Sequence, residues 1–126
     1  MFDVEFYEDQ NGEAPIRNFI IDLQAKGQTS KQDRIRVDKI LAYILVLERY
    51  GTRAGEPYVK HIEDDIWELR PLRDRIFFFV FTNKKLILLH HFFKKTQKTP
   101  RREIEAAIRN KKDYLERSKA HGKQFS

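Results

Sequence analysis

The sequence predicts an α+β fold in which helices pack on a small, twisted, mostly antiparallel sheet. The first half of the chain holds two amphipathic helical patterns, the second half changes to strand-like alternation and apolar runs, and a third helical pattern closes the chain. Helices and strands that are grouped along the chain in this way favour an α+β architecture. With 126 residues and no stretch suited to a linker, one domain over residues 1–126 is expected.

The N-terminal half is predicted to form a strand followed by a helical hairpin. Residues 2–6 alternate apolar and polar side chains, as a half-buried strand does. A helix is expected from Pro15 to a stop at Gly27, because apolar residues recur every three or four positions between them. Ser30 opens a second helix through a pattern that resembles a capping box, and this helix runs to about Tyr50. Two helices joined by so short a connection form a hairpin.

The second half is predicted to form three or four strands and a last helix. The expected strands cover residues 58–62, 66–70, 75–81 and 85–93. The two longer ones are expected to pair antiparallel through a turn at residues 82–84. Thr99 and Pro100 predict an N-cap and a first-turn proline, and the helix is expected to end near Ser118. Residues 119–126 are then expected to form a frayed tail.

Several classes of protein are disfavoured by composition. The chain has no cysteine, which excludes a disulfide scaffold, thiolate catalysis and cysteine-based zinc sites. His90 and His91 are adjacent on a strand, so they face opposite ways and cannot chelate one ion together. The five glycines are scattered and form no phosphate loop, so no metal and no cofactor are expected. No apolar run approaches a membrane span, and residues 1–5 are acidic, unlike a signal peptide, so a cytoplasmic location is expected.

The positive charge lies in the second half of the chain. The formal net charge is +6 in total, with −4 over residues 1–67, +3 over residues 68–93 and +7 over residues 94–126. Such asymmetry indicates either a polyanion or an acidic protein as a partner.

Two basic clusters remain as candidates for chemistry. The arginine-rich connection, residues 70–75, places three arginines between two expected strands, and the lysine-rich segment, residues 94–100, follows the last strand. If the strands pair as a meander, the two clusters approach one another at neighbouring strands. Arginine offers a planar fork that suits phosphate, and lysine offers a point charge.

Each of these features also has a plain structural interpretation. An arginine-rich connection is usually a solvated turn, and a lysine-rich segment before a helix is usually an exposed loop. Glu68 and Arg70 on one strand face fit a surface ion pair that adds little stability. His90 fits a hydrogen-bonded core residue, and residues 77–79 fit a hydrophobic core better than a platform for base stacking.

Two motifs in this region resemble a known family. Residues 67–78, WELRPLRDRIFF, resemble the W-E-L-R-P…R-I-F-Y segment of phage-derived toxin-like proteins. Residues 88–100, LLHHFFKKTQKTP, resemble the L-L-H-x-F-x-K-K-T-Q-K-T-P segment of the same proteins, and residues 103–107 continue the likeness into the last helix. On these motifs the chain resembles the RelE/ParE toxin superfamily, and within it the HigB-like toxins.

The resemblance implies both a fold and a function. The family fold packs two N-terminal helices on one face of a small twisted sheet. The family activity is ribosome-dependent cleavage of mRNA without a metal, in which the neighbouring 2′-OH attacks the phosphate. The family partner is a HigA-like helix-turn-helix antitoxin, and the toxin–antitoxin complex binds operator DNA through that antitoxin.

The resemblance also implies roles for individual residues. The expected catalytic residues, which would stabilise the phosphorane or move protons, are Arg70, Arg75, Lys94 and Lys98. The expected RNA-binding residues are Arg73, Lys95, Gln97 and His90, the last in a supporting role. A lysine that accepts a proton must be largely neutral, so its pKa must be lowered by burial or by neighbouring cations.

Two other functions remain open on the sequence. The same superfamily includes ParE-like toxins that inhibit DNA gyrase without cleaving RNA, and an inactive toxin that serves only as a co-repressor is a third possibility. For the antitoxin, an acidic segment is expected to cover either the Arg/Lys surface or the two N-terminal helices.

Overall fold

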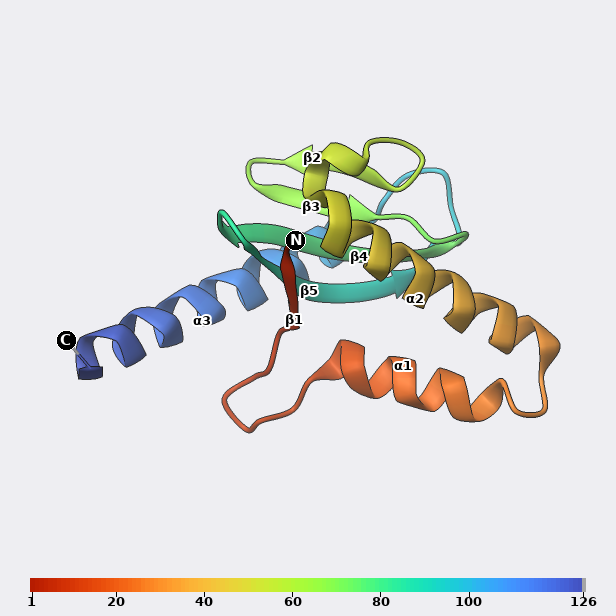
Figure 1. Ribbon diagram of the computed structural model, residues 1–126, viewed down its shortest axis with the longest axis horizontal. Helices are drawn as coiled ribbons and strands as arrows, with labels where there is room; N and C mark the ends of the chain where they lie inside the picture. Colours follow the sequence, from red (N-terminus) through yellow and green to blue (C-terminus); the bar gives the residue numbers. More distant parts are fainter. Residues whose placement is uncertain (126) are drawn as a thin grey trace.

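The computed structural model describes residues 1–125, with side chains for residues 1–120, and confirms the predicted α+β class (Figure 1). Two N-terminal helices, a five-stranded, mostly antiparallel sheet and a C-terminal helix make up the described chain. The elements in chain order are β1 (Asp3–Phe6), α1 (Pro15–Lys26), α2 (Lys31–Tyr50), the 3-10 helix η1 (Gly51–Ala54), β2 (Val59–Glu63), β3 (Ile66–Leu69), β4 (Asp74–Thr82), β5 (Lys85–Phe93) and α3 (Arg101–Phe125).

The sheet brings the two basic clusters together at one end of its strands β3, β4 and β5. Its strand order is β1-β5-β4-β3-β2, with β1 parallel to β5 and all other pairs antiparallel. The register of the β4–β5 hairpin pairs Asp74 with Phe93. The connection from β3 to β4 and the segment after β5 therefore lie side by side, at the right-hand end of Figure 1.

Helices cover the two faces of the sheet unequally. The core under α1 and α2 is built from apolar side chains of both helices and of β2 to β5, among them Ile40, Leu47 and Phe78. On the opposite face α3 packs on β5 and β4 through Ile104 and Ala107. The part of that face formed by β3 and the start of β4 lies beyond the main contacts of α3, and the arginine-rich connection begins there.

The ends of the helices agree with most of the predicted signals. The side chain of Ser30 accepts a hydrogen bond from the backbone N–H of Asp33 at 3.3 Å, so the predicted cap of α2 is confirmed. The helix α3 continues to Phe125, past the end expected near Ser118. The predicted frayed tail falls mostly on residues 121–126, which lie outside the described side chains, with Ser126 outside the described backbone as well. No helix among the described residues is long and apolar enough to cross a bilayer.

Candidate functional site

Three neighbouring strands bring the cations of the two basic clusters together. Arg70 follows β3, Arg75 lies near the start of β4, and Lys94 follows β5. The backbone N–H of Lys94 donates to the carbonyl of Arg73 at 2.7 Å, and Nε of Arg73 donates to the carbonyl of Lys94 at 3.1 Å. The two clusters are therefore joined directly, as the predicted meander requires.

A buried carboxylate lies at the centre of these cations. Glu68 is 2% exposed, and its Oε1 lies 3.3 Å from Nε of Arg70 and 3.7 Å from Nε of Arg75. Burial raises the pKa of the Glu68 carboxyl, while the charges of Arg75, Arg70, Lys94 and Lys60 act against this rise. The interpretation of Glu68 and Arg70 as a surface ion pair is therefore wrong, because the Glu68 carboxylate is buried and is shared by two arginines.

Arg75 is held rigidly by its own strand end. Its Nη1 donates to the carbonyl of Leu72 at 2.7 Å and to the carbonyl of Asp74 at 2.9 Å, and its Nε faces Glu68. The two hydrogen bonds use the protons on Nη1, and among the described residues Nη2 makes no hydrogen bond. Burial lowers the pKa of Arg75, Glu68 opposes this, and Arg70 adds to it. An arginine side chain nevertheless stays cationic near neutral pH.

Lys94 lies in a setting that favours its neutral form. Burial lowers the pKa of Lys94, and the nearby charges of Arg75, Arg70 and Lys60 lower it further, while Glu68 acts in the opposite direction. A lysine that accepts a proton needs a lowered pKa, and the pKa of Lys94 is shifted in this direction.

A shallow hollow of about 420 Å³ opens beside these residues. It is lined by Arg73, Arg75, Lys94, Lys95, Thr96 and Gln97. The lining contains four cationic and two uncharged polar side chains, which suits a phosphate group. The hollow thus brings together Arg75, Lys94 and three of the four residues expected to bind RNA.

Three expected site residues do not line this hollow: Arg70, which reaches Arg75 only through Glu68, and Lys98 and His90. Lys98 is exposed, and its carbonyl accepts a hydrogen bond from the hydroxyl of Thr96 at 2.8 Å. His90 is half-buried, and its Nε2 lies 2.9 Å from the Glu103 carboxylate on α3. The arrangement of His90 matches a hydrogen-bonded structural residue, and its role in RNA binding stays a prediction.

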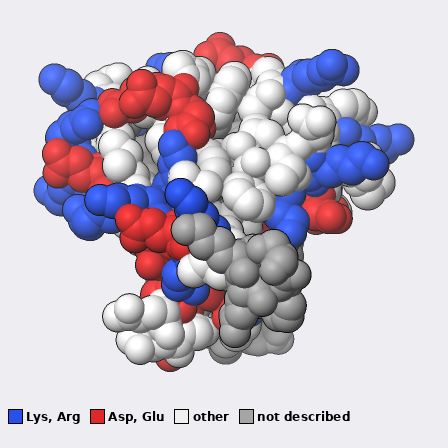
Figure 2. Space-filling view, turned by 90° about the vertical axis from the view of Figure 1, so that its left-hand side faces the viewer, with Lys and Arg blue, Asp and Glu red and all other residues white. Residues whose placement is uncertain are grey.

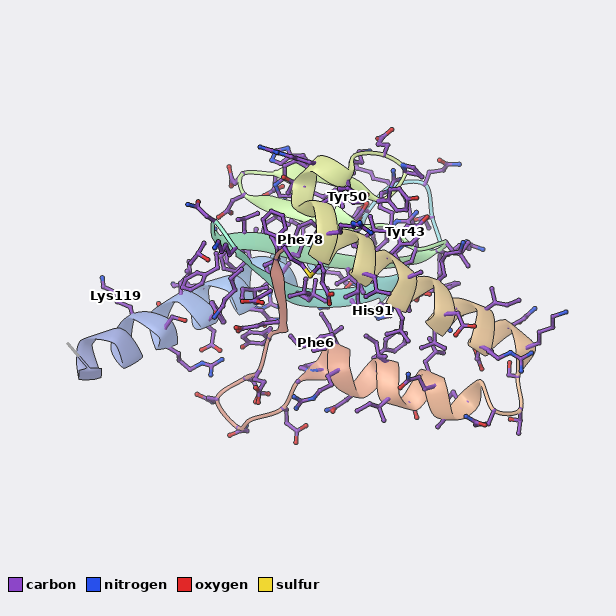
Figure 3. All side chains as sticks on the ribbon, viewed as in Figure 1. Phe6, Tyr43, Tyr50, Phe78, His91 and Lys119 are labelled. Atoms are coloured by element: carbon purple, nitrogen blue, oxygen red, sulfur yellow. The ribbon has the colours of Figure 1, made fainter. Side chains whose placement is uncertain are left out.

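A second charged cluster lies on the opposite face of the same strand end. Asp74 is fully buried, and its carboxylate accepts hydrogen bonds from Nε and Nη2 of Arg36 at 3.1 and 2.7 Å. The Nε2 of His91 lies 2.8 Å from the same carboxylate, and its ring stacks on Phe19 of α1 with centroids 3.8 Å apart. Figure 3 shows His91 between β5 and α1. This cluster ties both N-terminal helices to the strands that carry the site.

Sequence reasoning missed the parts played by Glu68 and Asp74. The sequence held a signal for Asp74, because Asp74 and Arg75 are neighbours on a strand and their side chains must therefore face opposite sides of the sheet.

The other end of the molecule is different in character. There, basic and acidic side chains lie next to one another around an uncharged area (Figure 2).

The fold and the hollow together define a small α+β protein with a phosphate-compatible cationic site at one sheet edge. Within residues 1–120 no group of three or more His, Asp and Glu side chains is placed to hold a metal ion. The family model described as phage-derived protein Gp49-like (DUF891) matches residues 28–112, more than half of the chain, and the chain belongs to this family. Gp49 proteins are HigB-like toxins of the RelE/ParE superfamily. A comparison with curated proteins found no match.

Proposed function

We propose that this chain is the toxin of a type II toxin–antitoxin system and acts as a metal-free, ribosome-dependent mRNA endoribonuclease. The observation that carries the proposal is the meeting of Arg75 and Lys94 in a hollow lined by cationic and uncharged polar side chains, with Arg70 joined to Arg75 through Glu68. Membership of the Gp49-like family supports the toxin class. The activity itself is inferred from the chemistry of the site.

The proposed reaction transfers a phosphoryl group within the RNA strand. The 2′-oxygen attacks the adjacent phosphorus, the bond from phosphorus to the 5′-oxygen breaks, and a 2′,3′-cyclic phosphate and a 5′-OH are formed. One proton leaves the 2′-OH and one reaches the departing 5′-oxygen. Extra negative charge gathers on the phosphorane oxygens, and fixed cations stabilise it most effectively.

The residues divide this work according to their surroundings. Arg75 is fixed by two carbonyls and lines the hollow, so it is assigned to the phosphorane oxygens, with Arg70 held near it by Glu68. Lys94 is assigned to proton transfer, because burial and neighbouring cations lower its pKa. Arg73, Lys95 and Gln97 are assigned to holding the RNA strand at the rim. The exposed Lys98 has less support for a catalytic role than the other three residues expected to act in catalysis.

The proposed partners follow from the proposed role as a ribosome-dependent toxin. The chain would meet mRNA on the ribosome, and a HigA-like helix-turn-helix antitoxin would restrain it and carry the complex to operator DNA. The basic second half of the chain suits contact with RNA, and such contact is expected to weaken with added salt.

The test is inducible expression of the wild type, Arg75→Ala and Lys94→Ala, with growth measured and transcript ends mapped. The wild type is expected to arrest growth and cut mRNA, and each variant is expected to lose at least about 100-fold of the cutting. Arg17→Ala, which changes an exposed arginine on α1, is the matched control and is expected to behave as wild type. Because Arg75 is buried and Lys94 is only half-buried, melting curves of both variants separate loss of fold from loss of activity.

Other outcomes refute parts of the proposal. Equal cutting by both variants and the wild type would remove the assigned site. DNA breaks and an SOS response without transcript cleavage would indicate a gyrase inhibitor instead. A wild type that neither arrests growth nor cuts RNA, but strengthens operator binding by its antitoxin, would indicate a co-repressor.

A further inference from the structure

Glu68 has the wrong charge for a site that binds RNA. A carboxylate repels the phosphate backbone, and burying it costs free energy unless cations compensate. Yet Glu68 is 2% exposed and lies beside the hollow, at the point where the cations of four segments meet. These cations are Lys60 on β2, Arg70 after β3, Arg75 on β4 and Lys94 after β5.

The contacts of Glu68 have a particular geometry. Oε1 faces the Nε atoms of both Arg70 and Arg75, at 3.3 and 3.7 Å. Among the described residues, neither of these Nε atoms nor Oε2 of Glu68 makes a hydrogen bond, so the attraction is electrostatic. In Arg75 the Nε edge faces the carboxylate while Nη1 is held by the carbonyls of Leu72 and Asp74, so this guanidinium is fixed from two sides.

We propose that Glu68 is a positioning residue for the reaction, whose buried carboxylate draws Arg70 and Arg75 together and fixes the Arg75 guanidinium at the wall of the hollow where the phosphate would bind. This inference rests on the proposed function for its catalytic meaning. Without the negative charge, the two guanidiniums repel one another and Lys94, and within residues 1–120 no hydrogen bond holds Nε of Arg70. Glu68 never touches the RNA in this arrangement, and it acts only through the arginines.

The direct test is Glu68→Gln, which keeps the size of the side chain and removes its charge. Cleavage on programmed ribosomes is expected to fall by about 10- to 100-fold, because displaced catalytic groups lose rate steeply. Binding of a short RNA oligonucleotide is expected to stay within about 3-fold, because the charge lost is one that repels RNA. A purely structural role would lower both quantities together with the fraction of folded protein.

Two further variants keep the inference falsifiable. Glu63→Gln is the matched control, because Glu63 is a carboxylate on β2 that pairs with an arginine, Arg101, away from the hollow. It is expected to cleave and bind as the wild type does. If Glu68→Gln does not fold, Glu68→Asp keeps the charge and shortens its reach, and a cleavage rate equal to that of the wild type would then overturn the proposal.

A measurement that needs no activity separates this inference from the proposed function. The Nε–H resonances of Arg70 and Arg75 in a ¹⁵N NMR spectrum are expected to be dispersed and slow to exchange in the wild type and in Glu63→Gln. In Glu68→Gln they are expected to collapse toward the resonances of solvated arginines. If the wild type shows ordered resonances that depend on Glu68 but cuts no RNA, the positioning stands and the nuclease proposal fails. If the wild type cuts RNA and Glu68→Gln cuts equally well, the positioning fails and the nuclease proposal stands.

Discussion

Replacing Asp74 by asparagine removes the charge that joins the N-terminal helices to the strands of the site. The Asp74 carboxylate is fully buried and holds Arg36 through two hydrogen bonds and His91 through a third. An asparagine of nearly the same shape keeps one acceptor oxygen and loses the other, together with the negative charge. Arg36 is then a cation without its main partner at the edge of the core.

The magnitude follows from these contacts. A hydrogen bond to a charged group contributes roughly 1.5–3 kcal/mol, and removing one partner of a buried pair costs about 3–5 kcal/mol. The Arg36 side chain is 27% exposed, so water can solvate part of its charge in the variant. We therefore expect Asp74→Asn to lower the free energy of unfolding by about 3 kcal/mol. For a domain of this size, that corresponds to a fall in Tm of roughly 10 °C.

Urea and thermal unfolding followed by circular dichroism measure this loss. Burial alone would raise the pKa of Asp74, but hydrogen bonds from His91 and Arg36 hold the pKa below its ordinary value. A carboxyl whose pKa is depressed in the folded state stabilises the fold above its unfolded pKa of about 4, and this contribution is lost as the pH falls further. The gap between wild type and Asp74→Asn should therefore be full near neutral pH and shrink below about pH 4.

Asp22→Asn is the control for this prediction. Asp22 forms an ion pair with Lys26 on α1, and both side chains are more than half exposed. Such a pair contributes less than about 1 kcal/mol, so the control should unfold nearly as the wild type does. A loss below about 1 kcal/mol in Asp74→Asn, or a loss that does not change on acidification, would refute the assignment of Asp74 as the anchor of the two helices.

The other predictions concern the scaffold and are read from urea unfolding curves. Gly51 has φ +58°, and a Cβ there would lie 2.8 Å from the Phe2 ring, so Gly51→Ala should cost about 3 kcal/mol. Gly12→Ala, with φ +79° but open space around it, should cost only about 1 kcal/mol, and equal losses would argue against the contact with Phe2. Ser30→Ala should cost about 1 kcal/mol through loss of the α2 cap, and an unchanged midpoint would show that the cap adds nothing. Phe78→Ala, at a fully buried ring under α2, should cost about 3–5 kcal/mol, and a loss below about 1.5 kcal/mol would mean that the core closes over the cavity.

Local patterns in the sequence were sufficient to predict most of the fold. The apolar spacing from Pro15 and the alternation before the turn at residues 82–84 depend only on neighbours in the chain, and both gave elements at the expected places. The parallel pairing of β1 with β5 was not predicted, because it joins segments about 80 residues apart and no local signal marks it. The end of α3 was also misplaced, since helix ends depend on weak local signals.

The candidate site could be predicted only in part, and the physical reason is burial. Residue type and order were enough to predict that the arginine-rich connection and the lysine-rich segment lie together at the ends of neighbouring strands. Whether a charged side chain on a strand is exposed or buried depends on what packs over it, and over Glu68 these are the long cationic side chains of neighbouring strands and connections. For that reason Glu68, 2% exposed, was interpreted as part of a surface pair. His90 could not be assigned to Glu103 before the position of α3 was known.

The positively charged region from residue 68 to residue 93 contains two acidic residues, and their positions determine what an approaching anion meets. Both Glu68 and Asp74 are buried and paired, one on each face of the sheet, so neither carboxylate is presented to an approaching anion. Because Asp74 and Arg75 are adjacent, the same strand end is fixed from the helical face by Asp74 and from the open face by Glu68 through Arg75. Asparagine at one position and glutamine at the other raise the net charge by the same amount, so a difference between them cannot come from net charge alone. We expect Asp74→Asn to act mainly on stability and Glu68→Gln mainly on cleavage, and an identical response of both variants in both assays would mean that only total charge matters.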